Sequence, residues 1–365
     1  MTTEFSRTDE LGPEKIIELY DPATSLKAIV VVDNVAAGPA IGGVRMAPDV
    51  TTDECFRLAR AMTLKNAMAG LAHGGGKSVI AADPRMPRSD RSKLIKAFAR
   101  AIADVRDYIP GPDMGTDEHA MAEVKHVIGR AVGLPREVGG IPLDEIGATG
   151  YGLAVALEAA APFCGLGQGD MRVVIQGFGS VGQHAIRFLA RRGARLVGVS
   201  DSRGARVCPT GFDLEALLAA KAGHQSVAEF DQGEVIDPEE LVAVDCEVWI
   251  PAARPDVIRE DNAGRMRTKV VAQGANIPAT PIAEEILART GVLVIPDFVA
   301  NAGGVICAAV EYHGGSESQA METIADKIRG NVTEVLTRAR DDGILPRAAA
   351  MQIAKERVLT AMSFR

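Results

Sequence analysis

The hydrophobic pattern of the first 140 residues predicts buried strands at irregular intervals. The apolar run LKAIVVVDN at 26–34 is typical of a buried strand, and SVIAADP at 78–84 predicts a second one after a glycine-rich stretch. The segment IPGPDMGT at 109–116 is rich in glycine and proline, so it is expected to be a loop.

Helical periodicity fills the intervals between these runs. Residues 52–71 have an amphipathic pattern, with Thr51 or Thr52 as the expected N-cap. A second helix is expected to be capped by Ser89, and a third by Thr116. The first region is therefore expected to be a mixed α/β domain.

From about residue 141 onward, strands and helices alternate regularly. Such alternation is typical of a doubly wound, mostly parallel sheet, so the fold class is α/β. The last part of the chain has helical patterns but no strand of its own. We therefore expect one domain at 1–140, a second at 141–317 and C-terminal helices at 318–365 that pack back on the first domain.

Composition excludes several classes of partner. The chain has 365 residues with a formal net charge of −8, which gives no electrostatic reason to bind nucleic acid or an anionic membrane surface. No apolar run approaches the roughly 20 residues of a membrane span. The polar N-terminal segment has no signal-peptide core, so a cytoplasmic location is expected.

The cysteines give no sign of a disulfide framework or a metal site. They are odd in number and widely spaced, without a CxxC pair: Cys55, Cys164, Cys208, Cys246 and Cys307. No bound metal is expected, and a reducing compartment fits this pattern best.

The segment Gly177-Phe178-Gly179-Ser180-Val181-Gly182 predicts a dinucleotide-binding loop of the Rossmann type. It follows the apolar run RVVIQ and begins a helical pattern, which is the context that the GxGxxG motif requires. Gly177 would allow a tight turn, and Gly179 would let backbone amides approach the pyrophosphate. Gly182 would let the helix pack closely on the strand. The alternative is a glycine turn that binds no ligand.

Asp201 lies at the end of the next strand pattern, RLVGVSD. An acid at this position accepts hydrogen bonds from the adenosine ribose, so NAD is the predicted cofactor. Arg203 and Arg206 follow directly and could receive a 2′-phosphate. NADP therefore stays an alternative.

Lys65 is a candidate for substrate binding. Together with Leu58, Met62 and Ala69 it lies on one face of the predicted helix 52–71, which places it on the apolar stripe. An unpaired ammonium is costly to bury, so Lys65 is expected to be paired or to face a cleft. The alternative is a lysine that snorkels at the edge of the stripe.

Lys77 and Asp113 are candidates for proton chemistry. Lys77 follows three glycines, which would let a ligand approach its ammonium group. A nucleotide P-loop is excluded because the required first glycine is Leu71, and because Lys77 precedes a strand pattern rather than a helix. Asp113 lies on a rigid loop before a helix, where a turn or capping role is the alternative.

In combination, these segments resemble the glutamate/leucine/phenylalanine/valine dehydrogenase family. The resemblance covers about residues 25–315 and depends on the order and spacing of the motifs. They are Gly42-Gly43-Val44-Arg45, Met62-Thr63-Leu64-Lys65-Asn66-Ala67, Gly74-Gly75-Gly76-Lys77, Gly111-Pro112-Asp113-Met114-Gly115-Thr116, Gly147-Ala148-Thr149-Gly150, the loop 177–182, Gly274-Ala275-Asn276 and Asn301-Ala302-Gly303-Gly304-Val305.

The resemblance implies roles for the candidate residues. The family lysine that matches Lys65 binds the substrate α-carboxylate, the one that matches Lys77 is catalytic, and the aspartate that matches Asp113 shuttles protons. It also implies that Asn276 and Asn301 lie near the substrate and the nicotinamide, and that Thr149 lies near the nicotinamide amide.

The resemblance also implies an activity and an architecture. The chain is expected to interconvert an L-amino acid with its 2-oxo acid and ammonia. The first domain is expected to bind the substrate and the second to bind the dinucleotide, with the active-site cleft between them. A homo-oligomer of undetermined size is expected. The alternatives are a catalytically silent dinucleotide-binding regulator and a 2-hydroxy-acid dehydrogenase, which usually needs a histidine near the hydride.

Two positions bear on the substrate side chain. Glutamate enzymes of the family place a lysine immediately before the two glycines of the first motif, where this chain has Ile41 before Gly42. They place a serine at the position of Ala308. An apolar branched-chain or aromatic substrate is therefore expected, because a carboxylate buried there would have no partner. Glutamate is the alternative, since residues 144–149 and 199–202 read more like the glutamate branch.

Overall fold

The computed structural model describes residues 7–167 and 171–365, and these form two compact units. We call the first the N-terminal unit; it comprises the chain up to Leu143 together with Val305–Ala320 and Met351–Arg365. The second, the central unit, comprises Asp144–Gly304 and Met321–Ala350. None of the described helices is long and apolar enough to cross a membrane.

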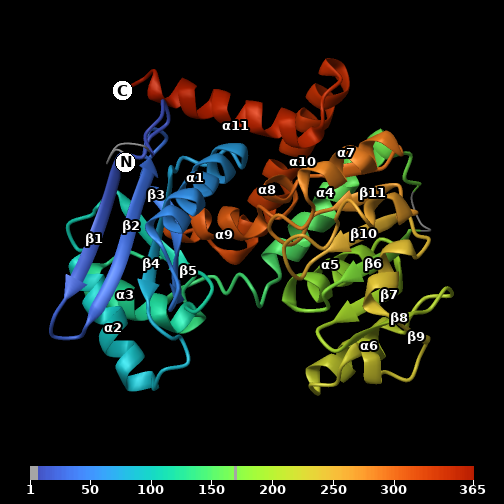
Figure 1. The fold of residues 1–365 in the computed structure, drawn as a ribbon, viewed down its shortest axis with the longest axis horizontal. Helices are drawn as coiled ribbons and strands as arrows, with labels where there is room; N and C mark the ends of the chain where they lie inside the picture. The colour runs from blue at the N-terminus through green and yellow to red at the C-terminus, as the bar shows by residue number, and fades with distance from the viewer. Residues whose placement is uncertain (1–6, 168–170) are drawn as a thin grey trace. The chain divides into compact units, whose positions relative to one another are not determined.

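The described part of the N-terminal unit contains a five-stranded mixed sheet in the order β1-β2-β4-β3-β5 (Figure 1). Its strands are β1 (Lys15–Asp21), β2 (Leu26–Asn34), β3 (Ala40–Ala47), β4 (Gly75–Ala81) and β5 (Tyr108–Pro112). β1, β2 and β4 pair antiparallel, whereas β3 runs parallel to both β4 and β5. The carboxyl ends of β3, β4 and β5 therefore lie at one edge of the sheet.

Helices cover both faces of this sheet. Helix α1 (Thr52–Met68) packs through Cys55 and Ala59 against Val31 and Val79. Successive strand residues point to opposite faces, so the neighbouring residues of β2 and β4 face the other way. There they form the larger core with α2 (Arg88–Ala101) and α3 (Glu118–Ile128).

Several expectations for this unit are confirmed and others are wrong. The strand at 26–34 is β2, and the helix 52–71 is α1, whose N-cap Thr51 accepts a hydrogen bond from the backbone nitrogen of Glu54. Ser89 does not cap α2, which begins at Arg88 after Pro87. The cap of α3 is Asp117 and not Thr116.

The strands β1, β3 and β5 did not stand out in the hydrophobic pattern. β3 carries the glycine pair Gly42-Gly43 and the charged Arg45, and β5 contains two prolines. Long-range pairing in the sheet overrides these weak local preferences, because β3 is hydrogen-bonded between β4 and β5. The segment 109–116 is therefore a loop only after Pro112.

The described part of the central unit contains a seven-stranded sheet in the order β12-β11-β10-β6-β7-β8-β9. Its strands are β6 (Arg172–Gln176), β7 (Arg195–Asp201), β8 (Gly204–Val207), β9 (Glu234–Ile236), β10 (Val248–Pro251), β11 (Val270–Ala272) and β12 (Leu293–Ile295). The strands β12, β11, β10, β6 and β7 are parallel, and β8 and β9 add antiparallel strands at one edge. The expected doubly wound, mostly parallel sheet is confirmed.

Helices connect these strands and continue to the end of the chain. They are α4 (Ala148–Cys164), α5 (Ser180–Ala190), α6 (Leu214–Ala222), α7 (Pro281–Arg289), α8 (Asp297–Ala300), α9 (Gly303–Tyr312), α10 (Glu317–Asp342) and α11 (Pro346–Met362). Short 3₁₀ helices are η1 (Arg136–Val138), η2 (Val227–Glu229), η3 (Pro238–Ala243) and η4 (Ala263–Arg265). The C-terminal helices contribute to both units.

Candidate active site

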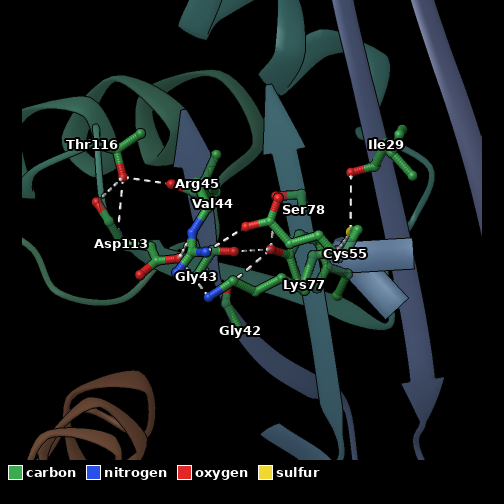
Figure 2. Close-up of polar contacts among 12 residues, drawn as sticks. Ile29, Gly42, Gly43, Val44, Arg45, Cys55, Lys77, Ser78, Asp113 and Thr116 are labelled. Atoms are coloured by element: carbon green, nitrogen blue, oxygen red, sulfur yellow. Dashed lines mark hydrogen bonds and ion pairs between the residues drawn. The ribbon is translucent and has the colours of Figure 1, made fainter. Parts of the chain in front are cut away.

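In the N-terminal unit, Lys77 and Asp113 form an ion pair (Figure 2). Lys77 lies in β4, and Asp113 directly follows β5. Lys77 Nζ lies 2.6 Å from Asp113 Oδ2, and the two side chains are 7% and 22% exposed. The sheet therefore brings together two of the residues expected to do proton chemistry and shields them from most of the solvent.

Arg45 is a second cation at this site, and the sequence had suggested no role for it. Its Nε lies 3.2 Å from Asp113 Oδ2, and its Nη1 lies 2.6 Å from Glu54 Oε1 in α1. The cluster thus contains two cations and two carboxylates. Once residues 40–47 are known to form a strand, the sequence does indicate Arg45: it is two residues from Gly43, so the two lie on the same face of β3.

The glycine that opens space beside Lys77 is Gly43, not the triplet before the lysine. A Cβ on Gly43 would lie 2.7 Å from Asp113 Cβ and 3.1 Å from Lys77 Nζ. A Cβ on Gly75, in contrast, would lie 2.0 Å from the backbone nitrogen of Thr63 in α1. The expectation that all three glycines leave room for a ligand is therefore wrong, because the space beside Gly75 is occupied by the backbone of α1. Lys77 also lies within β4 rather than before it.

The charge state of Asp113 follows from its neighbours. Burial alone would raise the pKa of this carboxyl, but the charge and hydrogen bond of Lys77, together with Arg45, lower the pKa below its usual value. Asp113 is therefore a carboxylate at neutral pH. It can accept a proton only when its contact with these cations weakens.

Hydrogen bonds hold the strand ends around this pair. Thr116 Oγ1 donates to the carbonyl oxygen of Val44 over 2.7 Å and accepts from the backbone nitrogen of Asp113 over 3.0 Å. The buried Tyr108 hydroxyl donates to the carbonyl oxygen of Gly42 over 2.9 Å. Figure 2 shows Thr116 bridging the Asp113 loop to β3. Thr116 therefore positions this loop instead of capping a helix.

Lys65 does not lie on the buried stripe of α1, so that expectation is wrong. The buried positions are Cys55, Ala59, Thr63, Asn66, Ala67 and Met68, whereas Leu58, Met62 and Lys65 are partly exposed. Small side chains face the sheet because α1 approaches the glycines of β4 closely. Lys65 itself is partly exposed, and it is not without a partner in the protein, as expected for an ammonium group at such a position.

Asn66, the residue after Lys65, is a positioning residue that the sequence had not indicated. Its Nδ2 donates to the carbonyl oxygens of Gly74, over 2.7 Å, and of Ile41. The side chain is fully buried. It therefore ties α1 to the glycine stretch before Lys77 and to the start of β3.

The two positions expected to contact the substrate side chain are both buried and apolar. Ile41 is paired with Gly75 and lies on the same face of β3 as Gly43 and Arg45. Ala308 lies in α9. Gly42 is held between the strands, since a Cβ there would lie 1.7 Å from the carbonyl oxygen of Gly76. Ile41 therefore adds apolar surface on the face that carries the Lys77–Asp113 pair.

In the central unit, the glycine loop between β6 and α5 fits a dinucleotide. Gly177 has φ +98°, a conformation that L-residues with a side chain rarely adopt. Ser180 and Val181 begin α5, so their backbone amides lie at a helix N-terminus, where phosphate binds. A Cβ on Gly179 would meet no atom within 4 Å, whereas one on Gly182 would lie 2.3 Å from the carbonyl oxygen of Gly177. The loop is thus tight inside and open at Gly179.

Asp201 lies at the end of β7 as expected, but its carboxylate is engaged within the protein. Oδ1 accepts from the backbone nitrogen of Arg203 and from Ser226 Oγ, and Oδ2 accepts from Lys221 Nζ and the backbone nitrogen of Val227, all over 2.8–2.9 Å. Although burial opposes it, these partners lower the pKa of Asp201 to about 2. All the acceptor positions of the carboxylate are therefore in use.

The arginines that follow Asp201 are also engaged. Arg203 Nη2 donates to the carbonyl oxygen of His224 over 2.9 Å, and its Nη1 lies 3.4 Å from Glu229. Arg206 donates to the carbonyl oxygens of Ala228, Gln232 and Gly233. These guanidinium groups brace the segment 224–233.

The two asparagines implied by the resemblance are in contact. Asn301 Nδ2 donates to Asn276 Oδ1 over 3.0 Å and to the carbonyl oxygen of Gly274. Thr149 lies in the first turn of α4, and a Cβ on Gly303 would lie 3.2 Å from its Cα. The central unit therefore brings the two asparagines into contact, and it places Thr149 beside Gly303, two residues after Asn301.

A buried ionic network supports this asparagine pair. Arg347 of α11 lies 2.8 Å from Glu284 and 2.9 Å from Asp297, and it donates to Gln273 Oε1 over 2.7 Å. Asp297 Oδ2 in turn accepts from the backbone nitrogen of Ile277, the residue after Asn276. No sequence signal indicated Arg347, because its partners lie fifty or more residues away in the chain.

Comparisons with known families cover nearly the whole chain. The family model described as "Glutamate/Leucine/Phenylalanine/Valine dehydrogenase" matches residues 139–365. A second, described as "Glu/Leu/Phe/Val dehydrogenase, dimerisation domain", matches residues 13–128.

The curated relatives are named glutamate dehydrogenases. One from Aeropyrum pernix is 39% identical over 357 residues, covering 91% of this chain and 85% of the relative. An NADP-specific one from Saccharolobus shibatae is 38% identical, covering 91% and 83%. An NAD-specific one from Staphylococcus aureus is 34% identical, covering 91% and 84%.

Among solved structures, the leucine-bound form of the hetero-hexameric glutamate dehydrogenase from Thermus thermophilus has a similar fold. The TM-score is 0.84 at 30% sequence identity, covering 96% of this chain and 89% of that one.

Proposed function

Because the chain belongs to the glutamate/leucine/phenylalanine/valine dehydrogenase family, whose members act on the CH–NH2 group of amino acids with NAD(P), we propose that Lys77 and Asp113 carry out this chemistry here. The observation that supports the assignment is their shielded ion pair, with 2.6 Å between Nζ and Oδ2. The overall reaction converts an L-amino acid, oxidised NAD(P) and water into a 2-oxo acid, ammonia, reduced NAD(P) and a proton.

The chain supplies proton transfer and orientation for this reaction. NAD(P), when bound, accepts the hydride that leaves the substrate Cα. The remaining iminium carbon must be attacked by water. Lys77 Nζ can take the proton of that water when neutral and can polarise the developing oxygen when charged. Asp113 exchanges protons with the substrate nitrogen.

Arg45 has a supporting role in this scheme. When Lys77 turns toward the substrate, Asp113 keeps a cation at 3.2 Å, so the carboxylate is not left buried without a partner. Lys65, which is partly exposed in the last turn of α1, is proposed to bind the substrate α-carboxylate. Thr149, Asn276 and Asn301 are proposed to contact the nicotinamide and the substrate.

The names of the relatives favour L-glutamate as the substrate. All three relatives described above are glutamate dehydrogenases and match more than four fifths of their own length. They support glutamate better than the apolar preference expected from the sequence, which they do not confirm. We therefore propose glutamate as the first candidate.

Ile41 and Ala308 favour a second candidate, an apolar branched-chain or aromatic amino acid. Both residues are buried, and neither offers a partner to a side-chain carboxylate. The lack of such a partner costs several kcal/mol, so it would lower kcat/KM for glutamate relative to an apolar amino acid by as much as ~10⁴-fold.

A substrate panel separates the candidates. We propose measuring kcat/KM for glutamate, leucine, valine and phenylalanine with the wild-type chain and with Ile41→Lys. If glutamate is the substrate, the wild-type chain turns it over best. If Ile41 selects an apolar side chain, leucine, valine or phenylalanine is best, and Ile41→Lys shifts the preference toward glutamate. Absence of turnover with every amino acid would contradict the proposed reaction.

We further propose NAD as the preferred cofactor and a homo-oligomeric assembly. The relatives include both NAD- and NADP-specific enzymes, so the family leaves the choice open. The match of residues 13–128 to a dimerisation domain supports the assembly. Light scattering on the purified chain measures its mass directly.

A further inference from the structure

A pocket of about 410 Å³ lies in the central unit at the carboxyl ends of β6, β7 and β10. Its lining includes Gln176 and Gly177 at the end of β6, Asp201 and Ser202 at the end of β7, and Arg254 after β10. In a doubly wound sheet, this is the place where the adenosine end of a dinucleotide binds. The inference below rests on the use of NAD(P) by this unit.

The carboxylates that line this pocket are neutralised by partners. Asp201 is paired with Lys221, 2.8 Å away, and also accepts three further hydrogen bonds. Glu239 lies 3.0 Å from Arg259, which also lines the pocket. Neither carboxylate therefore presents an uncompensated negative charge to a ligand.

Arg254 differs from the other cations of this region. It is exposed, and among residues 7–167 and 171–365 it makes no hydrogen bond or ion pair. Arg203 and Arg206, which the sequence had suggested for a 2′-phosphate, are held by carbonyl oxygens of the segment 224–233. The pocket therefore has one uncompensated positive charge, and Arg254 carries it.

We infer that Arg254 binds the 2′-phosphate of NADP beside Asp201, so that the chain accepts NADP as well as NAD. A guanidinium group donates two parallel hydrogen bonds to a phosphate, which suits a dianionic group on the ribose. Asp201 does not oppose this binding, because Lys221 balances its charge. NAD lacks the phosphate and gains nothing from Arg254.

The test compares two probes that differ by the 2′-phosphate. Purified wild-type chain and Arg254→Gln are titrated calorimetrically with 2′,5′-ADP and with 5′-AMP, without any turnover. We expect the variant to lose about ten-fold in affinity for 2′,5′-ADP, which is about 1.4 kcal/mol, while its affinity for 5′-AMP changes little. Because the guanidinium of Arg254 makes no hydrogen bond or ion pair with the residues that the structure describes, the melting temperature of the variant should equal that of the wild type.

Arg267→Gln is the matched control. Arg267 is also exposed and without a side-chain partner among the described residues, but it does not line the pocket. Its replacement should leave both affinities unchanged. Arg254→Lys should keep part of the 2′,5′-ADP affinity, since it retains the charge but not the fork of donors.

Three results would overturn the inference: a wild-type chain that does not bind 2′,5′-ADP, an Arg254→Gln variant that binds it as tightly as the wild type, or an equal loss of affinity for both probes. An equal loss would place Arg254 on the 5′-phosphate shared by NAD and NADP. The binding test is independent of the reaction. If the chain turned over no amino acid but still bound 2′,5′-ADP in a way that depends on Arg254, the proposed reaction would be contradicted and this inference would still hold.

Discussion

Gly75, in the glycine stretch before Lys77, and Gly179, in the dinucleotide loop, differ in what surrounds them. A Cβ added to Gly75 would lie 2.0 Å from the backbone nitrogen of Thr63, whereas one added to Gly179 would meet no atom within 4 Å. Gly75 lets a helix approach a strand, and Gly179 leaves its surroundings open. The same residue type in two motifs therefore serves packing in the N-terminal unit and ligand access in the central unit.

The difference also explains the two charge clusters. In the N-terminal unit, close packing of α1 on β4 surrounds Lys77, so its partner Asp113 is held at 2.6 Å in a shielded place. In the central unit, the loop leaves backbone amides of α5 accessible, and specificity has to come from side chains around the pocket. Substitutions of the two glycines should therefore fail in different ways.

The largest effect is expected from Gly75→Ala. The added methyl would overlap the backbone of α1, which cannot move without separating helix and strand, so we expect a loss of at least ~3 kcal/mol in the free energy of unfolding. Urea unfolding followed by circular dichroism measures this. A stability equal to that of the wild type would show that Gly75 is not required for packing.

A smaller and different effect is expected from Gly179→Ala. The backbone of Gly179 is extended, so alanine can adopt its conformation, and the methyl would fill only the space next to the phosphate-binding amides. We expect about ten-fold weaker NADH binding, or about 1.4 kcal/mol, with an unchanged melting temperature. Fluorescence titration and calorimetry test this pair of outcomes. Unaltered NADH affinity would mean that the open space is not where the dinucleotide binds.

The smallest effect is expected from Asp201→Asn, and it concerns the pH dependence of the free energy of unfolding. The pKa of Asp201 is lowered from the usual value of 3.8 to about 2, so its carboxylate contributes stability that is fully present above about pH 4. This contribution is lost as the pH falls from about 4 to about 2. We expect Asp201→Asn to reduce the free energy of unfolding by about 1 kcal/mol at neutral pH and by progressively less in acid. A difference that stayed constant down to pH 2 would contradict the ionic role of Asp201.

Local patterns predicted the parts of the fold that depend on local sequence. The strand β2 has a continuous apolar run, and the loop 177–182 has its glycines between a strand and a helix pattern. Both were predicted correctly. β3 was missed because Gly42 and Gly43 have low strand preference, and the strand exists only through pairing with β4 and β5.

Long-range contacts determine the features that local sequence patterns could not predict. In α1, Leu58 and Met62 read as a core-facing stripe, but the buried face carries smaller side chains such as Ala59, because the helix lies close to Gly75. Asp201 was placed correctly at the end of β7. Its partners Lys221 and Ser226 are more than eighteen residues away in the chain, so no local pattern could show that its carboxylate is already engaged.

The central claim is that the shielded Lys77 carries out the proton chemistry of amino-acid oxidation. The direct test is the turnover of Lys77→Ala on the best amino acid of the panel, with NADH binding measured on the same sample. Lys93→Ala serves as the control, because Lys93 is 71% exposed and its ion pair within the described part of the chain is with Asp90, on the surface of α2.

We expect Lys77→Ala to lose at least ~10²-fold in kcat, the lower end for general acid–base catalysis. NADH binding should persist, because the glycine loop belongs to the central unit, and Lys93→Ala should retain full turnover. Wild-type turnover in Lys77→Ala would contradict the assignment of Lys77 as the catalytic residue.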